Sequence, residues 1–292
     1  MEINTEYKDR LFRLLFGSEE HKDNILSLYN ALQGTDYTDP DAIELTTIGN
    51  AIYIGMKNDV SFIIDNRMPL WEQQSTYNPN MPVRGLIYYG KLYEAYLERK
   101  GKRQYSTVLL KIPTPQYIVF YNGDRMRPAI EQMRLSDAFL DQGLDSGCEW
   151  TAKVYNLNSS ENKVLLDSCK PLADYTELVR RISSGCRKGM TKEEIVRVVD
   201  DAIKSCIRDG ILVDFLTKHR AEVIDVWITE YNEKDFAETM FEDGRQAGIE
   251  AGLRQVVSNM LQFGKSPQEI HDECQIPLDL IEKVQKEILE KV

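Results

Sequence analysis

The apolar positions in the first third of the chain change from helical to strand-like spacing. Between Thr5 and Phe16 they recur with the period of a helix behind a Thr N-cap, and the same spacing predicts a second helix over residues 21–32. From Ile43 to Gln74 the chain is rich in Ile, Val and Phe and is interrupted at Gly49-Asn50 and Asp65-Asn66, which is typical of short strands joined by turns. The pattern therefore predicts two helices followed by a β-rich segment.

Helices and strands alternate in the middle of the chain, and only helices follow. Apolar spacing predicts elements over residues 83–100 (helix), 117–121 (buried strand), 150–157 (strand) and 174–182 (helix). From residue 191 onward the pattern is helical, with capping boxes formed by Thr191 with Glu194 and by Ser266 with Glu269. This order of elements is typical of an α/β fold with a helical extension.

The change in element type near residue 172 divides the predicted architecture. We expect an α/β domain over residues 1–172 and a helical region over residues 173–292. The last part, residues 256–292, contains two short amphipathic helices and has the outline of a helix-turn-helix. Its second helix mixes acids with bases, so packing or self-association into a homo-oligomer is favoured over reading a DNA groove. An earlier helical face, where we expect another backbone to pack closely, carries Gly244, Gly248 and Gly252.

Composition excludes several classes of protein. The chain has 292 residues, 42% of them apolar, a mean hydropathy of -0.42 and no apolar run long enough to span a bilayer. Its first residues are charged and lack a signal-peptide pattern, so we expect a cytoplasmic protein without membrane contact. Five cysteines without a CxxC pair, and His21, His219 and His271, show no spacing typical of a zinc site or a catalytic triad. The sequence therefore indicates that any metal is held by oxygen atoms.

Charge is distributed unevenly along the chain. The net charge is -11, which counts against a protein that coats nucleic acid without specificity. Residues 81–130, however, contain nine Lys and Arg side chains and only three acids. Such a segment attracts a polyanion; the alternative is an ordinary solvated loop and helix face. If the segment binds DNA, we expect its bases to line the approach to the candidate site.

Two strands of the β-rich segment bring acidic and amide side chains together. Reading residues 57–75 as a hairpin joined at Asn66-Arg67 pairs Asp59 with Gln74, Ser61 with Glu72, and Ile63 with Leu70. Side chains alternate along a strand, so Asp59, Glu72 and Gln74 then share one face. The opposite face is predicted to face the core, with Val60, Phe62, Ile64 and Trp71.

Carboxylate and amide oxygens in this arrangement suit a hard divalent cation. Directly opposed Cβ atoms of a hairpin lie about 5 Å apart and diagonal ones about 7–8 Å, so Asp59 and Glu72 can share one ion. Mg²⁺ or Mn²⁺ bound there lowers the pKa of a water molecule and offsets the charge of a phosphodiester transition state. Taken alone, however, an acid pair on a strand is more often solvated surface than a metal site.

Several segments resemble a family of nucleases. In the PD-(D/E)xK superfamily an acid on one strand precedes acid-x-Lys on the next, and IGMKNDVSFII and LWEQQSTYNPNMPVRGLIYYGKLY resemble its recombination-promoting nuclease and putative transposase family. TPQYIVFYNG and the later EDGRQAGIEAG carry the same resemblance, which covers most of residues 1–180 and the helix after residue 240. Its most specific part is residues 72–89. The resemblance implies a restriction-endonuclease-like core, in which a mixed central sheet is flanked by helices.

The resemblance also assigns roles to residues of the hairpin. It implies that Asp59 and Glu72 are metal ligands and catalytic residues, with Gln74 where the superfamily usually has lysine. An amide can orient water or phosphate but supplies no positive charge, so a nearby base, Arg84 or Lys91, is expected to compensate. Arg84 is favoured because a guanidinium binds phosphate through two nitrogens. The alternative for both bases is ordinary surface charge.

Other side chains are candidates for catalysis or DNA contact. Tyr77, Tyr88 and Tyr89 can stack on bases or touch phosphate, but aromatic residues at such positions are more often part of the core. Many superfamily members carry an acid on the first helix, for which Glu6 or Asp9 can serve, and the spacing does not choose between them.

The sequence and its resemblance predict a metal-dependent DNA endonuclease that hydrolyses phosphodiester bonds, in DNA recombination, a mobile element or defence. No serine or tyrosine recombinase mechanism is implied, and the family name is not evidence of integration. The alternative is a catalytically silent DNA-binding or assembly protein that keeps the nuclease fold. The glutamine at position 74 and the net charge of -11 leave that alternative open.

Overall fold

The computed structural model describes residues 10–46, 60–102, 105–123, 125–141, 146–187 and 189–289. Asp59 and both candidate acids of the first helix, Glu6 and Asp9, lie outside these residues. The chain divides into two compact units, Met1–Glu230 and Tyr231–Val292. The sequence-based boundary near residue 172 instead marks a change of element type, because the described strands end at Asn156.

The first unit is built from strands and helices in alternation. Its strands are β1 (Glu44–Leu45), β2 (Val60–Ile63), β3 (Arg67–Gln74), β4 (Thr114–Tyr121), β5 (Ile130–Arg134) and β6 (Thr151–Asn156). Its helices are α1 (Arg10–Phe16), α2 (Lys22–Gln33), α3 (Met81–Arg99), α4 (Lys163–Ser168), α5 (Lys170–Gly185), α6 (Lys192–Arg208) and the start of α7 (Val213–Gln262). Short 3₁₀ helices are η1 (Glu19–His21), η2 (Pro40–Ala42), η3 (Leu135–Ala138) and η4 (Ser160–Asn162). The predicted α/β class is confirmed, and β5 is a strand that the sequence pattern missed.

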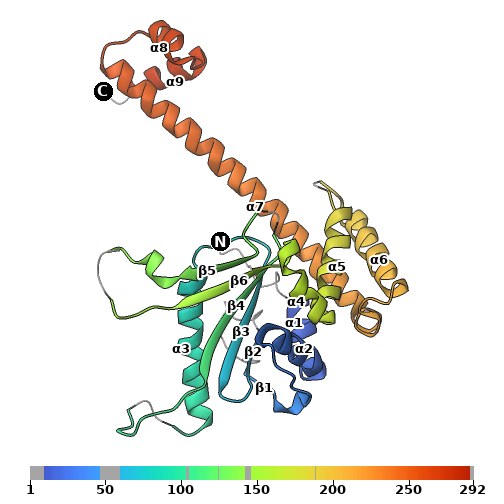
Figure 1. Cartoon of the computed structure of the whole chain (residues 1–292). Coiled ribbons are helices and arrows are strands. Elements are labelled where there is room, and N and C mark those ends of the chain that lie inside the picture. The colour runs from blue at the N-terminus through green and yellow to red at the C-terminus, as the bar shows by residue number, and fades with distance from the viewer. Residues whose placement is uncertain are drawn as a thin grey trace. The chain divides into compact units, whose positions relative to one another are not determined.

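The six strands form one mixed sheet in the order β1-β2-β3-β4-β6-β5. Strands β1, β2 and β3 pair antiparallel, β3 pairs parallel with β4, β4 pairs parallel with β6, and β5 returns antiparallel beside β6. Helix α3 connects β3 to β4, as a parallel pair requires a long crossover. Figure 1 shows α3 on one side of the sheet, with α1 and α2 on the other. The expected mixed sheet flanked by helices is therefore present.

Both faces of the central strands are buried. On the α3 face, Met68 and Leu70 of β3 pack with Tyr117 and Val119 of β4 and with Leu92 of α3. The opposite face is aromatic: the Phe62 and Trp71 ring centroids lie 4.8 Å apart, and Phe12 of α1 lies 5.3 Å from Phe120. Parallel strands are usually covered on both faces in this way. A charged side chain among the inner residues of β3, 68–73, is consequently enclosed by protein.

The hairpin register differs from the sequence-based prediction by two residues. Ser61 pairs with Leu70 rather than with Glu72, and Ile64 bridges to Arg67, so the turn consists of Asp65 and Asn66. Asp65 has a φ of 50°, a left-handed conformation that Asp tolerates better than most residues, and this permits a two-residue turn one position earlier than predicted. A shift of two preserves the face on which each side chain lies, so Glu72 stays on the face of Leu70. The predicted pairing of Asp59 with Gln74 lies outside the described residues.

The second unit contains the rest of α7, with α8 (Pro267–Cys274) and α9 (Leu278–Leu289). Its apolar core holds Val257, Ile270, Ile276, Ile281 and Val284. The predicted capping box of Ser266 with Glu269 begins α8, and that of Thr191 with Glu194 begins α6 in the first unit. A Cβ added at Gly248 or Gly252 meets no atom of this chain within 4 Å, so no backbone of this chain packs closely at these two described positions. Among the described helices, none has the length and apolar character needed to cross a membrane.

Candidate active site

Glu72 is a charged residue enclosed in the interior of the first unit. It lies near the carboxyl end of β3, and its side chain has 0% exposure. Ligands of α/β sheets commonly bind at the carboxyl ends of the strands. Burying a carboxylate is unfavourable unless other groups compensate its charge and satisfy its oxygens. The surroundings of Glu72 therefore decide what it can do.

Three side chains bind the two carboxylate oxygens of Glu72. Arg84 Nη2 on α3 lies 2.5 Å from Oε1, and Gln74 Nε2 donates to the same oxygen over 2.7 Å. The Tyr117 hydroxyl on β4 donates to Oε2. The structure thus brings together Glu72, Gln74 and Arg84, three residues that the sequence singled out. Their catalytic roles stay predictions.

Burial and charge act in opposite directions on this cluster. Burial raises the pKa of Glu72 above its ordinary value, while the charge of Arg84 and the hydrogen bonds from Tyr117 and Gln74 reduce that rise. Burial alone lowers the pKa of Arg84, but the charge of Glu72 and the contact with Tyr88 outweigh it, so the pKa of Arg84 is raised. Arg84 is therefore a cation, and it compensates the buried carboxylate only in part.

Gly85 and Tyr117 belong to the site although the sequence analysis did not select them. The parallel register pairs Leu70 with Tyr117, which puts Tyr117 on the face of Glu72. A Cβ added at Gly85 of α3 would lie 2.5 Å from the Tyr117 ring, so only glycine leaves room for that ring beneath the helix. The sequence could not predict that Tyr117 lies beside Glu72, because the register of a parallel strand pair depends on the crossover through α3.

The candidate tyrosines have structural partners. Tyr89 is buried, its hydroxyl donates to the Met68 carbonyl over 2.6 Å, and it accepts from the Gln116 backbone N–H over 3.0 Å. The Tyr77 ring is half-buried, and the Arg127 guanidinium lies 3.9 Å from its centroid. Because Arg127 covers one face of Tyr77, that face is unavailable for stacking on a base. These contacts favour the core interpretation of the tyrosines.

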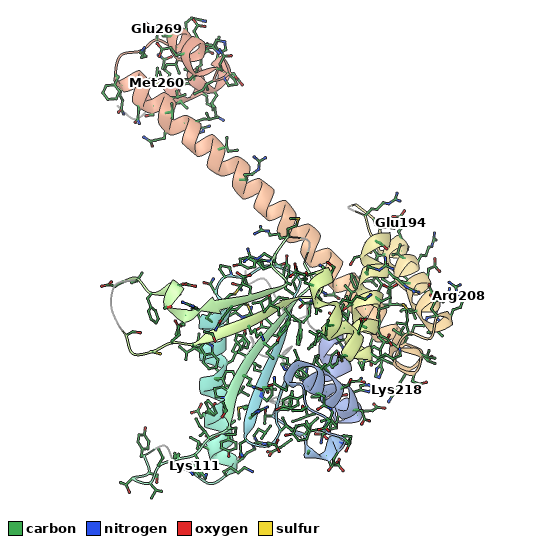
Figure 2. The ribbon with its side chains drawn as sticks, viewed as in Figure 1. Lys111, Glu194, Arg208, Lys218, Met260 and Glu269 are labelled. Atoms are coloured by element: carbon green, nitrogen blue, oxygen red, sulfur yellow. The ribbon has the colours of Figure 1, made fainter. Side chains whose placement is uncertain are left out.

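The bases of residues 81–130 do not converge on Glu72. Arg99 Nη1 lies 2.7 Å from Glu44 Oε1, and Lys100 lies 4.0 Å from the same carboxylate. Fifteen helical residues separate Arg84 from Arg99, which is roughly 22 Å along α3. Lys111 (Figure 2) is exposed in the loop before β4, at the end of the sheet where Thr114 pairs with Arg67. The expectation that these bases line one approach is wrong for Arg99, Lys100 and Lys111.

Lys91, the second candidate for the compensating base, follows Arg84 by seven residues on the same helix. Two helical turns return it to nearly the same side of α3, about 10 Å farther along the axis. Its side chain is half-buried. Arg84, which contacts Glu72 directly, is therefore the better placed of the two bases.

The described residues offer part of a Mg²⁺ or Mn²⁺ site. Glu72 supplies a carboxylate, Gln74 supplies an amide oxygen, and Mg²⁺ typically uses only one or two carboxylates while keeping several waters. A divalent cation favours the ionised form of a carboxylate whose pKa is raised by burial, and the partial compensation by Arg84 leaves a reason for such a cation. To bind it, Glu72 must release Arg84 or Gln74 from Oε1.

Comparison of the chain with protein-family models, with curated proteins and with solved structures gives no match. The surroundings of Glu72 and the resemblance of the sequence segments therefore indicate what the protein does.

Proposed function

We propose that the protein is a divalent-metal-dependent DNA endonuclease with a restriction-endonuclease-like core, in which Glu72 is a metal ligand. The observation that carries the proposal is a fully buried carboxylate in the middle of a sheet, with an amide and a guanidinium on the same face. A buried ion pair often contributes little net stability compared with apolar residues of similar volume. Carboxylates whose pKa is shifted by burial and by a charged partner are enriched at functional sites.

Each residue of the cluster has a distinct part in this proposal. Glu72 binds Mg²⁺ or Mn²⁺ together with Asp59, the sequence neighbour of Val60 at the start of β2. The ion supplies a water of lowered pKa and offsets charge on the scissile phosphate. Arg84, released from Glu72, binds the phosphate through two nitrogens. Gln74 orients the phosphate or the attacking water through its amide, and Tyr117 donates a hydrogen bond to Oε2 of Glu72.

A supercoiled-plasmid assay with Mg²⁺ or Mn²⁺ tests this function. Wild type is expected to nick the plasmid, Asp59→Asn and Glu72→Gln to abolish nicking, and Gln74→Ala to slow it. Gln74→Lys restores a charge and should retain activity. Gln73→Ala is the matched control, because Gln73 lies on the opposite face and donates to Asn122 Oδ1 over 2.6 Å, away from Glu72.

One observation favours the alternative of a catalytically silent DNA-binding or assembly protein. Both oxygens of Glu72 already have partners, and Arg84 compensates part of its charge without a metal. Calorimetric titration of Mn²⁺ separates the two functions. A folded wild type that neither binds Mn²⁺ nor nicks the plasmid supports the silent protein, and one that loses Mn²⁺ binding on Glu72→Gln supports the nuclease.

A further inference from the structure

Two histidines far apart in the sequence meet beside an acid in the first unit. Among the residues that the structure describes, one group of three or more His, Cys, Asp or Glu side chains places its ligand atoms within 4.8 Å of one another: Glu20, His21 and His219. Glu20 and His21 belong to η1, and His219 belongs to α7. The sequence spacing gave no metal signal because the chain between them holds the whole sheet.

One ring nitrogen of His219, a member of this group, has no hydrogen-bond partner among the described residues. Its Nδ1 lies 2.8 Å from Glu222 Oε2, while its Nε2 is buried and has no hydrogen-bond partner among the described residues. A carboxylate accepts hydrogen bonds, so in the neutral imidazole Nδ1 carries the proton and Nε2 presents a lone pair. Buried polar atoms are seldom left without a partner. A carboxylate on the far nitrogen is also the usual arrangement behind a histidine that binds a metal.

The backbone at His219 departs from helical geometry. Its φ of -107° and ψ of 19° interrupt α7, so two helical stretches are joined there. Phe215 packs on the His219 ring, with 5.0 Å between centroids, and the His21 ring lies 6.2 Å from that of His219. These contacts hold the imidazole of His219 in place, with its side chain 16% exposed.

We infer that Glu20, His21 and His219 bind a divalent transition-metal ion of the Zn²⁺ type, which ties η1 to α7. Two imidazoles with one carboxylate suit Zn²⁺ or Co²⁺ better than Mg²⁺, and water completes the coordination. Ligand atoms around tetrahedral Zn²⁺ lie about 3.4 Å apart, so the group must contract. Glu20, whose side chain is 57% exposed, and the half-buried His21 have the freedom to close on His219.

Lys218 (Figure 2) competes with the ion for Glu20. Its ammonium pairs with Glu20 Oε1, which leaves Oε2 for a metal but places a positive charge nearby. Removing that charge should strengthen metal binding. If Glu20 is a metal ligand, Lys218→Met should bind the metal ion more tightly than wild type. If the cluster has only a structural role, this variant should gain no metal affinity.

Equilibrium dialysis against Zn²⁺, with Co²⁺ absorption as a second reading, tests the inference on the full chain. Wild type should bind one ion, His21→Gln, His219→Gln and Glu20→Gln should lose it, and Glu222→Gln should weaken it about 10–100-fold. His271→Gln is the matched control, because His271 is in the second unit and its Nδ1 contacts the Ile276 carbonyl. Glu20→Gln alters an exposed side chain, so its loss of binding is not explained by misfolding.

Two results overturn the inference: a wild type that binds no Zn²⁺, or a His219→Gln variant that binds Zn²⁺ as tightly as wild type. The site is independent of the proposed nuclease centre. Glu72→Gln should keep Zn²⁺ binding, and failure of one site leaves the other untouched.

Discussion

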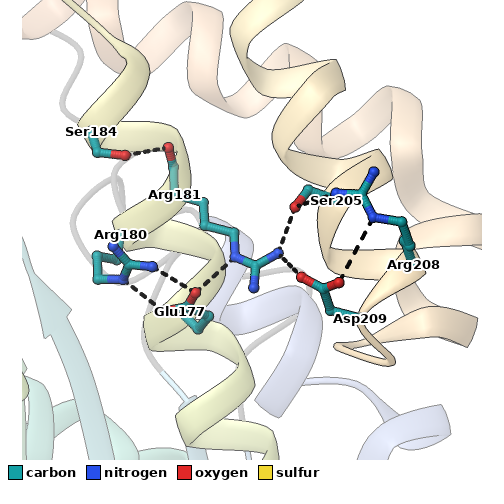
Figure 3. Close-up of polar contacts among 7 residues, drawn as sticks. All are labelled: Glu177, Arg180, Arg181, Ser184, Ser205, Arg208 and Asp209. Atoms are coloured by element: carbon teal, nitrogen blue, oxygen red, sulfur yellow. Dashed lines mark hydrogen bonds and ion pairs between the residues drawn. The ribbon is translucent and has the colours of Figure 1, made fainter.

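Two glutamates of the first unit are paired with arginine, Glu72 with one guanidinium and Glu177 with two, yet their pKa values shift in opposite directions. Glu177 of α5 accepts from Arg180 and Arg181, and Arg181 continues to Ser205 and Asp209 of α6 (Figure 3). These hydrogen bonds lower the pKa of Glu177 to about 2, whereas burial raises the pKa of Glu72. The difference is exposure: the side chain of Glu177 is 29% exposed and that of Glu72 is 0% exposed. Guanidinium partners therefore lower the pKa of the partly exposed carboxylate of Glu177, whereas the single partner of the buried Glu72 offsets only part of the rise that burial causes.

The largest effect is expected from breaking the buried pair. Glu72→Leu leaves the Arg84 guanidinium, 32% exposed, without its counter-charge, and we expect a loss of about 3 kcal/mol of unfolding free energy. The double variant Glu72→Leu with Arg84→Met removes both charges and should regain most of that loss. Urea unfolding of wild type, Glu72→Leu, Arg84→Met and the double variant measures the cycle. A Glu72→Leu variant as stable as wild type would contradict the view that Arg84 depends on Glu72.

A smaller effect is expected where α3 crosses Tyr117. Gly85→Ala places a Cβ 2.5 Å from the Tyr117 ring, and displacing that ring should cost about 2 kcal/mol. Gly90→Ala on the same helix is the control, since its Cβ meets nothing within 4 Å. It should stabilise the protein by about 0.5–1 kcal/mol because alanine is the better helix former. Equal effects of the two changes in urea unfolding would show that the close approach at Gly85 is unimportant.

The smallest effect on stability is expected at Glu177, which pairs with Arg180 and Arg181, and it depends on pH. The folded pKa of Glu177 is about 2, below its ordinary value of 4.5, so its stabilisation is present above pH 4.5 and disappears as the pH falls toward 2. At pH 7, Glu177→Gln should lose about 1 kcal/mol, the upper range for exposed ion pairs. Thermal unfolding between pH 7 and pH 2 should show the two proteins converging. Arg208→Gln is the control. Its Nε lies 3.8 Å from Asp209, a longer ion pair than the 2.7 Å pairs of Glu177, so its loss should have less effect on stability. A gap between wild type and Glu177→Gln that is constant over this range would be inconsistent with the lowered pKa.

Local periodicity predicted much of the fold. The helix over residues 83–100, the strands over 117–121 and 150–157, and the shared face of Glu72 and Gln74 follow from spacings of two or about four residues, which the backbone imposes. Strand β5 was missed because only Met133 of its five residues is buried, so the pattern shows no apolar alternation.

Contacts between distant parts of the chain could not be predicted from the sequence. The hairpin register differs from the predicted one because Asp65 adopts a left-handed backbone conformation, which the alternation of apolar and polar residues does not reveal. The contact of Tyr117 with Glu72 needs the parallel register across α3, and the meeting of His21 with His219 needs the whole first unit to fold. Spacing along the chain therefore identified the acid and amide of the candidate site, but not the side chains that set their charge.

The ends of the sheet have a consequence for aggregation. An unpaired strand edge can recruit another chain, and proteins limit this with very short edge strands and with charged residues. Strand β1 at one end has two residues, and β5 at the other carries Glu131 and Arg134. We therefore expect the folded sheet to resist strand-to-strand polymerisation even at high protein concentration.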